Sequence, residues 1–222
     1  YFYRQGLNVS GLVRDYQKYQ NADIPFVTPV WGSLDDIPDE ALKGISYFIH
    51  VAGVISAKHK NPYYDINTSG TRNLLERIKL NNPDFERFLY ISSLAAAGPA
   101  LLQPRTSDEI EKPVSHYGRS KFLGEQEVEK SISSFTILRP PVLYGPYDRG
   151  MLLPFQCAEK YGVAPLVGKG LSKMDFLFIE DFARACYDAI QSPATIGKKY
   201  FLGENPLNWQ EIWGLMKTDS GK

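Results

Sequence analysis

The sequence predicts an α/β fold built on a doubly wound, mainly parallel sheet, with a small C-terminal lobe. Strand and helix signals alternate along the chain, which is the pattern of crossover units that produce parallel sheets. The strand candidate at 45–54 is a continuous apolar run, as expected of a strand buried on both faces, and 85–93 is a second buried strand candidate. With 222 residues, of which 43% are hydrophobic, the chain is long enough to bury a sizeable core.

The individual elements follow from local composition and spacing. Segments rich in β-branched and aromatic residues predict strands at 7–14, 26–34, 45–54, 85–93, 135–140, 175–179 and 198–202. Between them, helices are predicted at 67–80, 115–130, 151–161, 180–190 and 208–216. Leu74, Leu75 and Ile78 have helical spacing within the first of these helices. Ser115 is placed to cap the second.

The first residues of the chain indicate an incomplete sheet. Residues 1–6 resemble the end of a helix closed by Gly6, and the strand candidate at 7–14 follows at once. In a doubly wound dinucleotide fold, a first strand and a Gly-rich turn precede such a helix, and that strand is central to the sheet. Its absence would leave unpaired backbone in the core, so we expect this strand and turn to lie outside the given sequence.

Composition and charge exclude several classes of protein. Lys+Arg and Asp+Glu each number 25, so the net charge is zero and we expect no nucleic-acid partner. No apolar run approaches the length of a membrane span, so we expect no membrane partner. Cys157 and Cys186 form no disulfide framework and fit a reducing, cytoplasmic compartment. The three His have no Cys or carboxylate at ligand spacing, so we expect no metal site.

Tyr117 and Lys121 stand four residues apart at the start of a predicted helix. Since the chain contains 14 Tyr, about one Tyr-x-x-x-Lys is expected by chance, and the spacing alone carries no weight. The surroundings are more informative, because polar or small residues such as Arg14, Gly53 and Ser93 stand at the ends of predicted strands. Carboxyl ends of parallel strands meet at one edge of a sheet, where ligands bind in this architecture.

Six motifs, in this order and spacing, carry a resemblance to a known family. They are HVAG (50–53), NTSGTRNLL (67–75), YISSLAAAG (90–98), YGRSK (117–121), LRPPVLYGP (138–146) and FIEDFARA (178–185). From Arg14 to about Asp181, the chain resembles the extended branch of the short-chain dehydrogenase/reductase superfamily, which includes NAD-dependent epimerases, dehydratases and reductases. The family's Gly-rich fingerprint is absent.

The resemblance implies a domain organisation. Residues 1–146 would form a Rossmann-type dinucleotide-binding domain, to which 176–191 would return. Residues 147–175 and 192–222 would form part of the substrate-binding lobe. The resemblance also implies a homodimer, which would pack through the helices near 67–80 and 115–130.

The resemblance also implies catalytic roles. Tyr117 would exchange a proton with a substrate hydroxyl or carbonyl, and Lys121 would favour the phenolate and hold the nicotinamide ribose. Ser93 would hydrogen-bond the reacting oxygen of a small-molecule substrate. Asn67 would bind a water behind Lys121; its alternative role is a helix N-cap. Arg149 would contact an anionic substrate, or alternatively form a surface ion pair.

Ten residues would contact the cofactor. They are Arg14, Ser33, Leu34, Ala52, Gly53, Val54, Tyr117, Lys121, Pro140 and Val142. At the end of the second strand of a dinucleotide fold, an acid binds the ribose of NAD, whereas an Arg accepts the 2′-phosphate of NADP. Arg14 therefore favours NADP, while Asp15 leaves NAD possible.

Residues after Ser93 separate the candidate reactions. The 4,6-dehydratases of this branch carry an Asp-Glu pair where Leu94 and Ala95 stand, so that reaction is excluded. Many nucleotide-sugar epimerases carry Tyr at the position of Ala97. The preferred function is therefore an NADP-dependent oxidoreductase that acts on a ketone, aldehyde or secondary alcohol. A nucleotide-sugar epimerase is the alternative. A non-catalytic sensor or scaffold is less favoured, because Ser93, Tyr117 and Lys121 are all present.

Overall fold

The computed structural model describes residues 1–22, 24–100, 105–106, 109–148, 150–166, 168–203 and 206–220, except the side chains of 216–220. The chain divides into two compact units. The first comprises Tyr1–Arg139 and Ala183–Phe201. The second comprises Pro140–Phe182 and Leu202–Lys222. None of the helices in the described part of the chain is long and apolar enough to cross a membrane.

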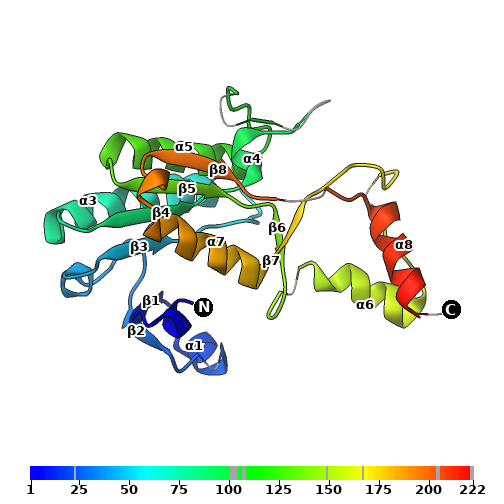
Figure 1. The fold of residues 1–222 in the computed structure, drawn as a ribbon, viewed down its shortest axis with the longest axis horizontal. Coiled ribbons are helices and arrows are strands. Elements are labelled where there is room, and N and C mark those ends of the chain that lie inside the picture. The colour runs from blue at the N-terminus through cyan, green and yellow to red at the C-terminus, as the bar shows by residue number, and fades with distance from the viewer. Residues whose placement is uncertain are drawn as a thin grey trace. The chain divides into compact units, whose positions relative to one another are not determined.

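All named strands of the first unit pair in parallel, which confirms the predicted α/β class (Figure 1). The strands are β1 (Val9–Val13), β2 (Val27–Trp31), β3 (Tyr47–His50), β4 (Arg87–Ile91), β5 (Phe135–Arg139) and β8 (Lys198–Phe201). They form a two-stranded sheet, β1-β2, and a four-stranded sheet in the order β3-β4-β5-β8. Every residue of β4 and β5 is buried, including Arg87 and Arg139, which confirms the burial predicted for the strand at 85–93.

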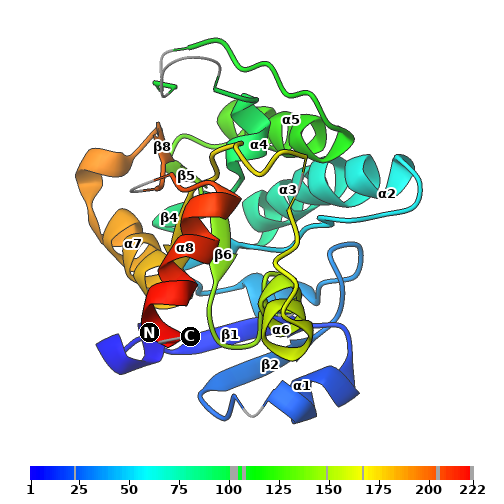
Figure 2. The same ribbon diagram turned by 90° about the vertical axis from the view of Figure 1, so that its right-hand side faces the viewer.

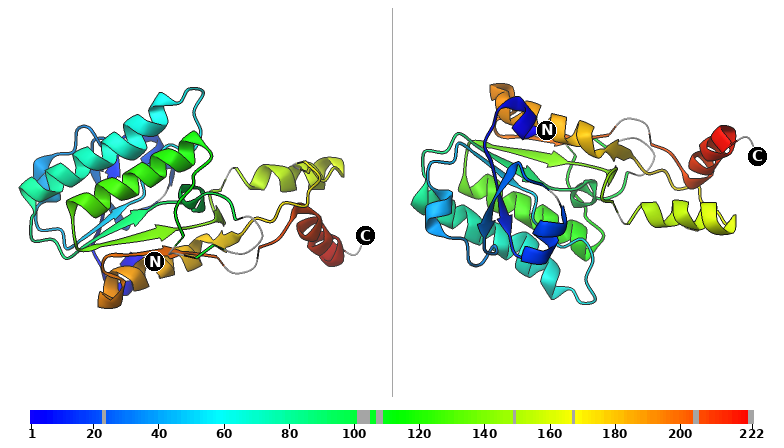
Figure 3. Two further views of the ribbon diagram at one scale, coloured as in Figure 1. Left: turned by 90° about the horizontal axis from the view of Figure 1, so that it is seen from above. Right: turned by 90° about the horizontal axis from the view of Figure 1, so that it is seen from below.

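Helices cover both faces of the four-stranded sheet. Those of the first unit are η1 (Phe2–Gln5), α1 (Tyr16–Ala22), η2 (Asp39–Leu42), α2 (Asn61–Tyr64), the π-helix η3 (Asp65–Gly70), α3 (Thr71–Asn81), α4 (Leu94–Ala97), α5 (His116–Ser131) and η4 (Pro193–Thr195), with most of α7 (Ile179–Gln191). Helices α3 and α5 lie on one face and α7 on the other (Figure 3), while α1 lies beside β2 (Figure 2). Side chains of α3 and α5, including Leu75, Ile78 and Val128, pack on Phe88 and Ile137.

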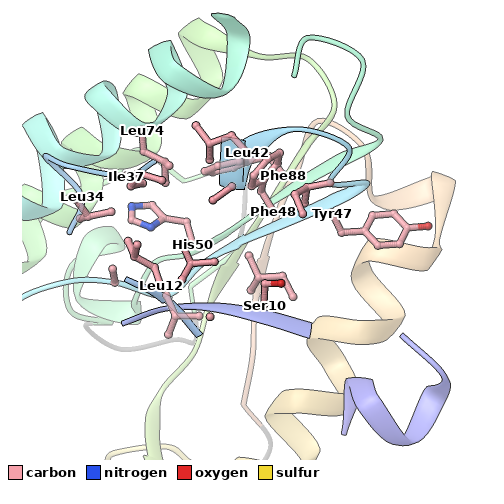
Figure 4. Close-up of a pocket in the computed structure, with 17 residues that line it drawn as sticks. Ser10, Leu12, Leu34, Ile37, Leu42, Tyr47, Phe48, His50, Leu74 and Phe88 are labelled. Atoms are coloured by element: carbon pink, nitrogen blue, oxygen red, sulfur yellow. The ribbon is translucent and has the colours of Figure 1, made fainter. Parts of the chain in front are cut away.

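A cavity of about 360 Å³ lies beside β1 and β3 (Figure 4). Its walls are mostly apolar and include Leu12 of β1, Phe48 of β3 and Leu74 of α3. His50 also lines it, and its Nε2 lies 2.9 Å from the Thr71 hydroxyl oxygen. Burial lowers the pKa of His50 to about 3, so its imidazole is neutral at physiological pH.

The second unit has its own small sheet and core. Strand β6 (Val142–Tyr144) pairs in parallel with β7 (Phe176–Phe178). Helices α6 (Leu152–Tyr161) and α8 (Trp209–Ser220) contribute to its apolar core, together with Phe176 of β7. The stacked indole rings of Trp209 and Trp213 have centroids 5.5 Å apart, and Phe155 packs on both.

The predicted helix at 67–80 begins at another residue in the structure. Helix α3 starts at Thr71, and the preceding turn, Asp65–Gly70, is a π-helix that continues α2 into α3. Asn67 therefore lies inside a continuous helical segment and does not cap a helix N-terminus. A π-helix is a local rearrangement that sequence periodicity does not reveal, and it often accompanies functional sites.

Candidate active site

Ser93 and Tyr117 come together from two elements of the first unit. Ser93 follows β4 and caps α4, where its side chain accepts a hydrogen bond from the Ala95 backbone N–H at 3.2 Å. Tyr117 lies in the first turn of α5, which Ser115 caps by accepting from the Gly118 N–H at 3.0 Å. Burial raises the pKa of the Tyr117 phenol, and a hydrogen bond from the Ser93 side chain opposes that rise. The structure thus joins two of the predicted catalytic hydroxyls.

A close approach of α4 and α5 makes this contact possible. An ideal Cβ added to Gly118 would lie 2.2 Å from the Ala95 carbonyl oxygen, so only glycine fits between the two helices. The residue after Tyr117 is therefore dictated by backbone packing against the helix that Ser93 caps.

Replacing Gly118 by Ala should separate the two helices. Because the methyl group meets backbone, we expect a stability loss of about 1–3 kcal/mol, measured by urea unfolding. Gly214→Ala is the matched control: it lies in α8, and nothing lies within 4 Å of its added Cβ. That change should be neutral or stabilising by up to about 1 kcal/mol. Equal effects of the two changes would contradict close packing at Gly118.

Lys121 lies one helical turn beyond Tyr117 and is buried, with 3% of its surface exposed. Its Nζ is 4.3 Å from the centroid of the Tyr90 ring, a cation–π contact. Burial lowers the pKa of Lys121 to about 8, and the negative charge of Glu125 opposes that effect. An added Cβ at Gly53 would lie 3.8 Å from Lys121 Nζ, which places the loop after β3 next to the ammonium.

Asn67 holds that loop against α5. Its Oδ1 accepts from the Val54 N–H at 2.7 Å, and its Nδ2 donates to the Val54 carbonyl at 3.0 Å. The same Nδ2 donates to the Ser120 hydroxyl at 2.9 Å. Asn67 is fully buried, so these bonds fix Val54 relative to the helix that carries Tyr117 and Lys121.

The remaining residues predicted to bind cofactor lie in several places. Ala52, Gly53 and Val54 follow β3, and Arg14 is exposed directly after β1. Ser33 pairs through its backbone with Asp36.

Leu34 is partly buried, lines the cavity and packs near Gly70. Pro140 and Val142 belong to the second unit, where Val142 begins β6. Arg149 lies outside the described residues.

Several residues of this region were not predicted from the sequence. Tyr90 lies under Lys121, Ser120 binds Asn67, and the ring of Tyr63 is 6.4 Å from that of Tyr117. Ser120 falls inside the YGRSK motif, but its partner is 53 residues away, and no local signal identifies it.

Comparisons with known proteins agree with this architecture. Residues 1–203 match the model of the NAD dependent epimerase/dehydratase family. Ceramide reductase of Caulobacter vibrioides is 34% identical over 145 residues, which are 65% of this chain and 40% of that protein. N-acetyl-alpha-D-glucosaminyl-diphospho-ditrans,octacis-undecaprenol 4-epimerase of Escherichia coli O157:H7 is 26% identical over 182 residues, 75% of this chain and 52% of that protein. The chain thus spans about half the length of these relatives or less.

A solved structure extends the likeness to the whole fold. UDP-glucuronic acid 4-epimerase of Bacillus cereus, in complex with UDP-glucuronic acid and NAD, superimposes with a TM-score of 0.86 at 21% identity. The match covers 100% of this chain and 77% of that one. At this identity, the likeness shows a shared Rossmann-type fold.

Proposed function

The chain belongs to the NAD dependent epimerase/dehydratase family, and from this premise we propose that it transfers a hydride between a nicotinamide dinucleotide and a carbonyl or secondary alcohol. The observation that carries the proposal is the placement of Ser93 at the end of β4, close enough to Tyr117 to affect its pKa, with buried Lys121 one helical turn beyond Tyr117. Three groups suited to proton transfer and charge stabilisation meet at the carboxyl end of β4.

Each side chain has a distinct task in this reaction. The Tyr117 hydroxyl donates a proton to the substrate carbonyl during reduction and accepts it during oxidation. Ser93 hydrogen-bonds the reacting oxygen and orients it toward Tyr117. Lys121 supplies a positive charge in a desolvated place, which favours the phenolate form of Tyr117. A nicotinamide dinucleotide, when bound, supplies or accepts the hydride.

The residues present fit such a cofactor. Gly53 has no side chain, so the backbone after β3 is open to a ligand next to Lys121. A Cβ added at Gly53 would lie 3.0 Å from Asn67 Oδ1, which is a tight contact. Arg14 is exposed, and among the residues that the structure describes its side chain has no hydrogen bond or ion pair. Arg14 is thus available to an anionic group of the cofactor.

Contacts of Asp15 favour NADP as the preferred form. Its carboxylate accepts from the Lys18 backbone N–H at 3.1 Å and pairs with Lys18 Nζ at 3.5 Å. These contacts, the backbone bond first, lower the pKa of Asp15. An acid occupied in this way is less available to a ribose hydroxyl, whereas Arg14 offers a charge to a 2′-phosphate.

The Arg14→Ala variant tests this preference. We expect its Kd for NADPH to rise about tenfold or more, because a hydrogen bond to a charged group contributes about 1.5–3 kcal/mol. Its Kd for NADH should stay unchanged. Both constants can be measured by fluorescence titration, with Arg4→Ala as the control for loss of an exposed Arg. An equal loss for both nucleotides would contradict a 2′-phosphate contact.

A nucleotide-sugar epimerase is the second candidate. The E. coli relative is a 4-epimerase, and the B. cereus structure contains a UDP-sugar with NAD. The apolar run Leu94–Ala97 and the Caulobacter reductase support a reductase instead.

Incubation of the purified protein with NADPH and a panel of ketones and aldehydes, and separately with NAD and a panel of UDP-sugars, separates the two candidates. Net consumption of NADPH supports the reductase, and sugar interconversion without net consumption supports the epimerase. No nucleotide binding and no turnover would refute both.

A further inference from the structure

A buried group of charged side chains lies behind the candidate active site. Arg139 of β5 donates from Nε and Nη2 to the two carboxylate oxygens of Glu125, at 2.9 and 2.6 Å. The Arg139 side chain is 1% exposed and that of Glu125 is 0% exposed. Glu111 accepts from Arg139 at 2.6 Å, and Lys199 of β8 pairs with Glu111 at 3.2 Å and Glu125 at 3.6 Å.

Glu125 joins this group to the site at two points. On α5 it follows Lys121 by four residues, so the two side chains are neighbours on one helix face. It also accepts a hydrogen bond from the Ser92 hydroxyl, and Ser92 immediately precedes Ser93 at the end of β4. Tyr117, Lys121 and Glu125 therefore form a row along α5, at positions i, i+4 and i+8.

We propose that Glu125 is a positioning residue of this site: clamped by Arg139, it keeps Lys121 protonated and holds the strand end that carries Ser93. This inference rests on the proposed function, because Lys121 and Ser93 have catalytic roles only in that reaction. A carboxylate buried without solvent contact is costly unless it is paired, and Arg139 supplies that pair. Among the described residues, Glu125 and Lys121 form no direct ion pair, so the carboxylate acts on the ammonium through its charge.

Other groups near Lys121 do not supply this negative charge. Tyr90 of β4 presents its ring to Lys121, and Tyr117 of α5 is a phenol whose pKa burial raises. His50 of β3 is neutral, and Asn67 of η3 is an uncharged amide. Among the described residues, Glu125 is the acid whose charge acts on Lys121.

The titration of Lys121 tests the inference directly. In protein labelled with lysine-ε-¹³C, the Lys121 signal, assigned by its loss in Lys121→Met, should titrate near pH 8. In Glu125→Gln, we expect its midpoint to fall by about one pH unit or more, because a nearby opposite charge has been removed. Glu129→Gln is the matched control: it removes a carboxylate one turn further along α5, where Glu129 pairs with Lys199 at 3.1 Å. Its Lys121 midpoint should equal that of the wild type.

A double variant keeps the test usable if Glu125→Gln alone fails to fold. Glu125→Gln alone leaves Arg139 with Glu111 as its remaining carboxylate partner. Glu125→Gln combined with Arg139→Gln removes both charges. The titration midpoint of Lys121 should still fall, because Glu125 lies one turn from Lys121 on α5 and is the charge that acts on it. A midpoint that matches the wild type in either folded variant would overturn the inference.

Turnover provides an independent readout. The limb of the pH–rate profile that reports Lys121 should move to lower pH in Glu125→Gln and stay in place in Glu129→Gln. A wild-type protein without turnover would refute the proposed function, yet the Lys121 titration would still decide the role of Glu125. A normal wild-type rate with an unmoved profile in Glu125→Gln would refute the inference alone.

Discussion

The Tyr117→Phe variant should lose about two to four orders of magnitude in turnover, the usual contribution of a general acid or base. The change removes only the hydroxyl, on which Ser93 acts, and keeps the ring, which lies 6.4 Å from that of Tyr63. Folding and nucleotide binding should therefore remain close to wild type. The measurement is the rate of NADPH oxidation with any carbonyl substrate found in the panel, beside a fluorescence titration with NADPH.

Tyr63→Phe is the control for this experiment. Its ring is 6.4 Å from that of Tyr117, and its hydroxyl accepts from the Ala57 backbone N–H at 3.0 Å. Loss of that hydroxyl should change turnover by less than about tenfold, since one neutral hydrogen bond contributes about 1 kcal/mol. If Tyr117→Phe were as active as wild type, the phenol would have no part in proton transfer.

The Arg139→Met variant should show the largest loss of stability, about 3–5 kcal/mol in the free energy of unfolding. The change leaves the Glu125 carboxylate buried, with its bidentate partner removed. Methionine fills part of the volume without charge, so the loss arises mainly from the buried acid, which keeps only the Ser92 hydroxyl and Lys199, at 3.6 Å, as partners. Urea unfolding followed by circular dichroism measures it.

The chain contains a closely matched control for Arg139. Arg72 also binds a glutamate through Nε and Nη2, donating to Glu127 at 3.0 and 2.7 Å. The Arg72 side chain is 48% exposed, so Arg72→Met should cost no more than about 1 kcal/mol. Both pairs are bidentate; they differ in burial and in the added contacts of Arg139 with Glu111 and of Glu125 with Lys199. Similar losses in both variants would mean that burial does not set the cost of breaking such a pair here.

Most secondary structure was predictable because its signals are local. The helix predicted at 115–130 is α5, His116–Ser131, with Ser115 as its cap. The strands predicted at 85–93 and 135–140 contain β4 and β5. Alternation of strands and helices was sufficient to predict parallel pairing, since crossover connections leave little choice.

Short or irregular elements escaped prediction. Helix α4 has four residues, Leu94–Ala97, which is too few to show a period. The π-helix that contains Asn67 has no sequence signature, and its position depends on bonds to Val54 and Ser120. Its residues are distant in sequence from Ser120, so only the packed chain brings them together.

The positions of Ser93 after a strand and of Tyr117 and Lys121 on one helix were predictable, because strand ends and helical spacing are properties of local sequence. The catalytic roles of the three residues stay a prediction. The side chains that contact these residues could not be predicted from local sequence. Glu125 belongs to a helix and Arg139 to an apolar strand, and neither residue alone indicates an ion pair. Whether a charge is buried, and what neutralises it, depends on contacts between segments that only folding brings together, and the electrostatics of Lys121 follow from those contacts.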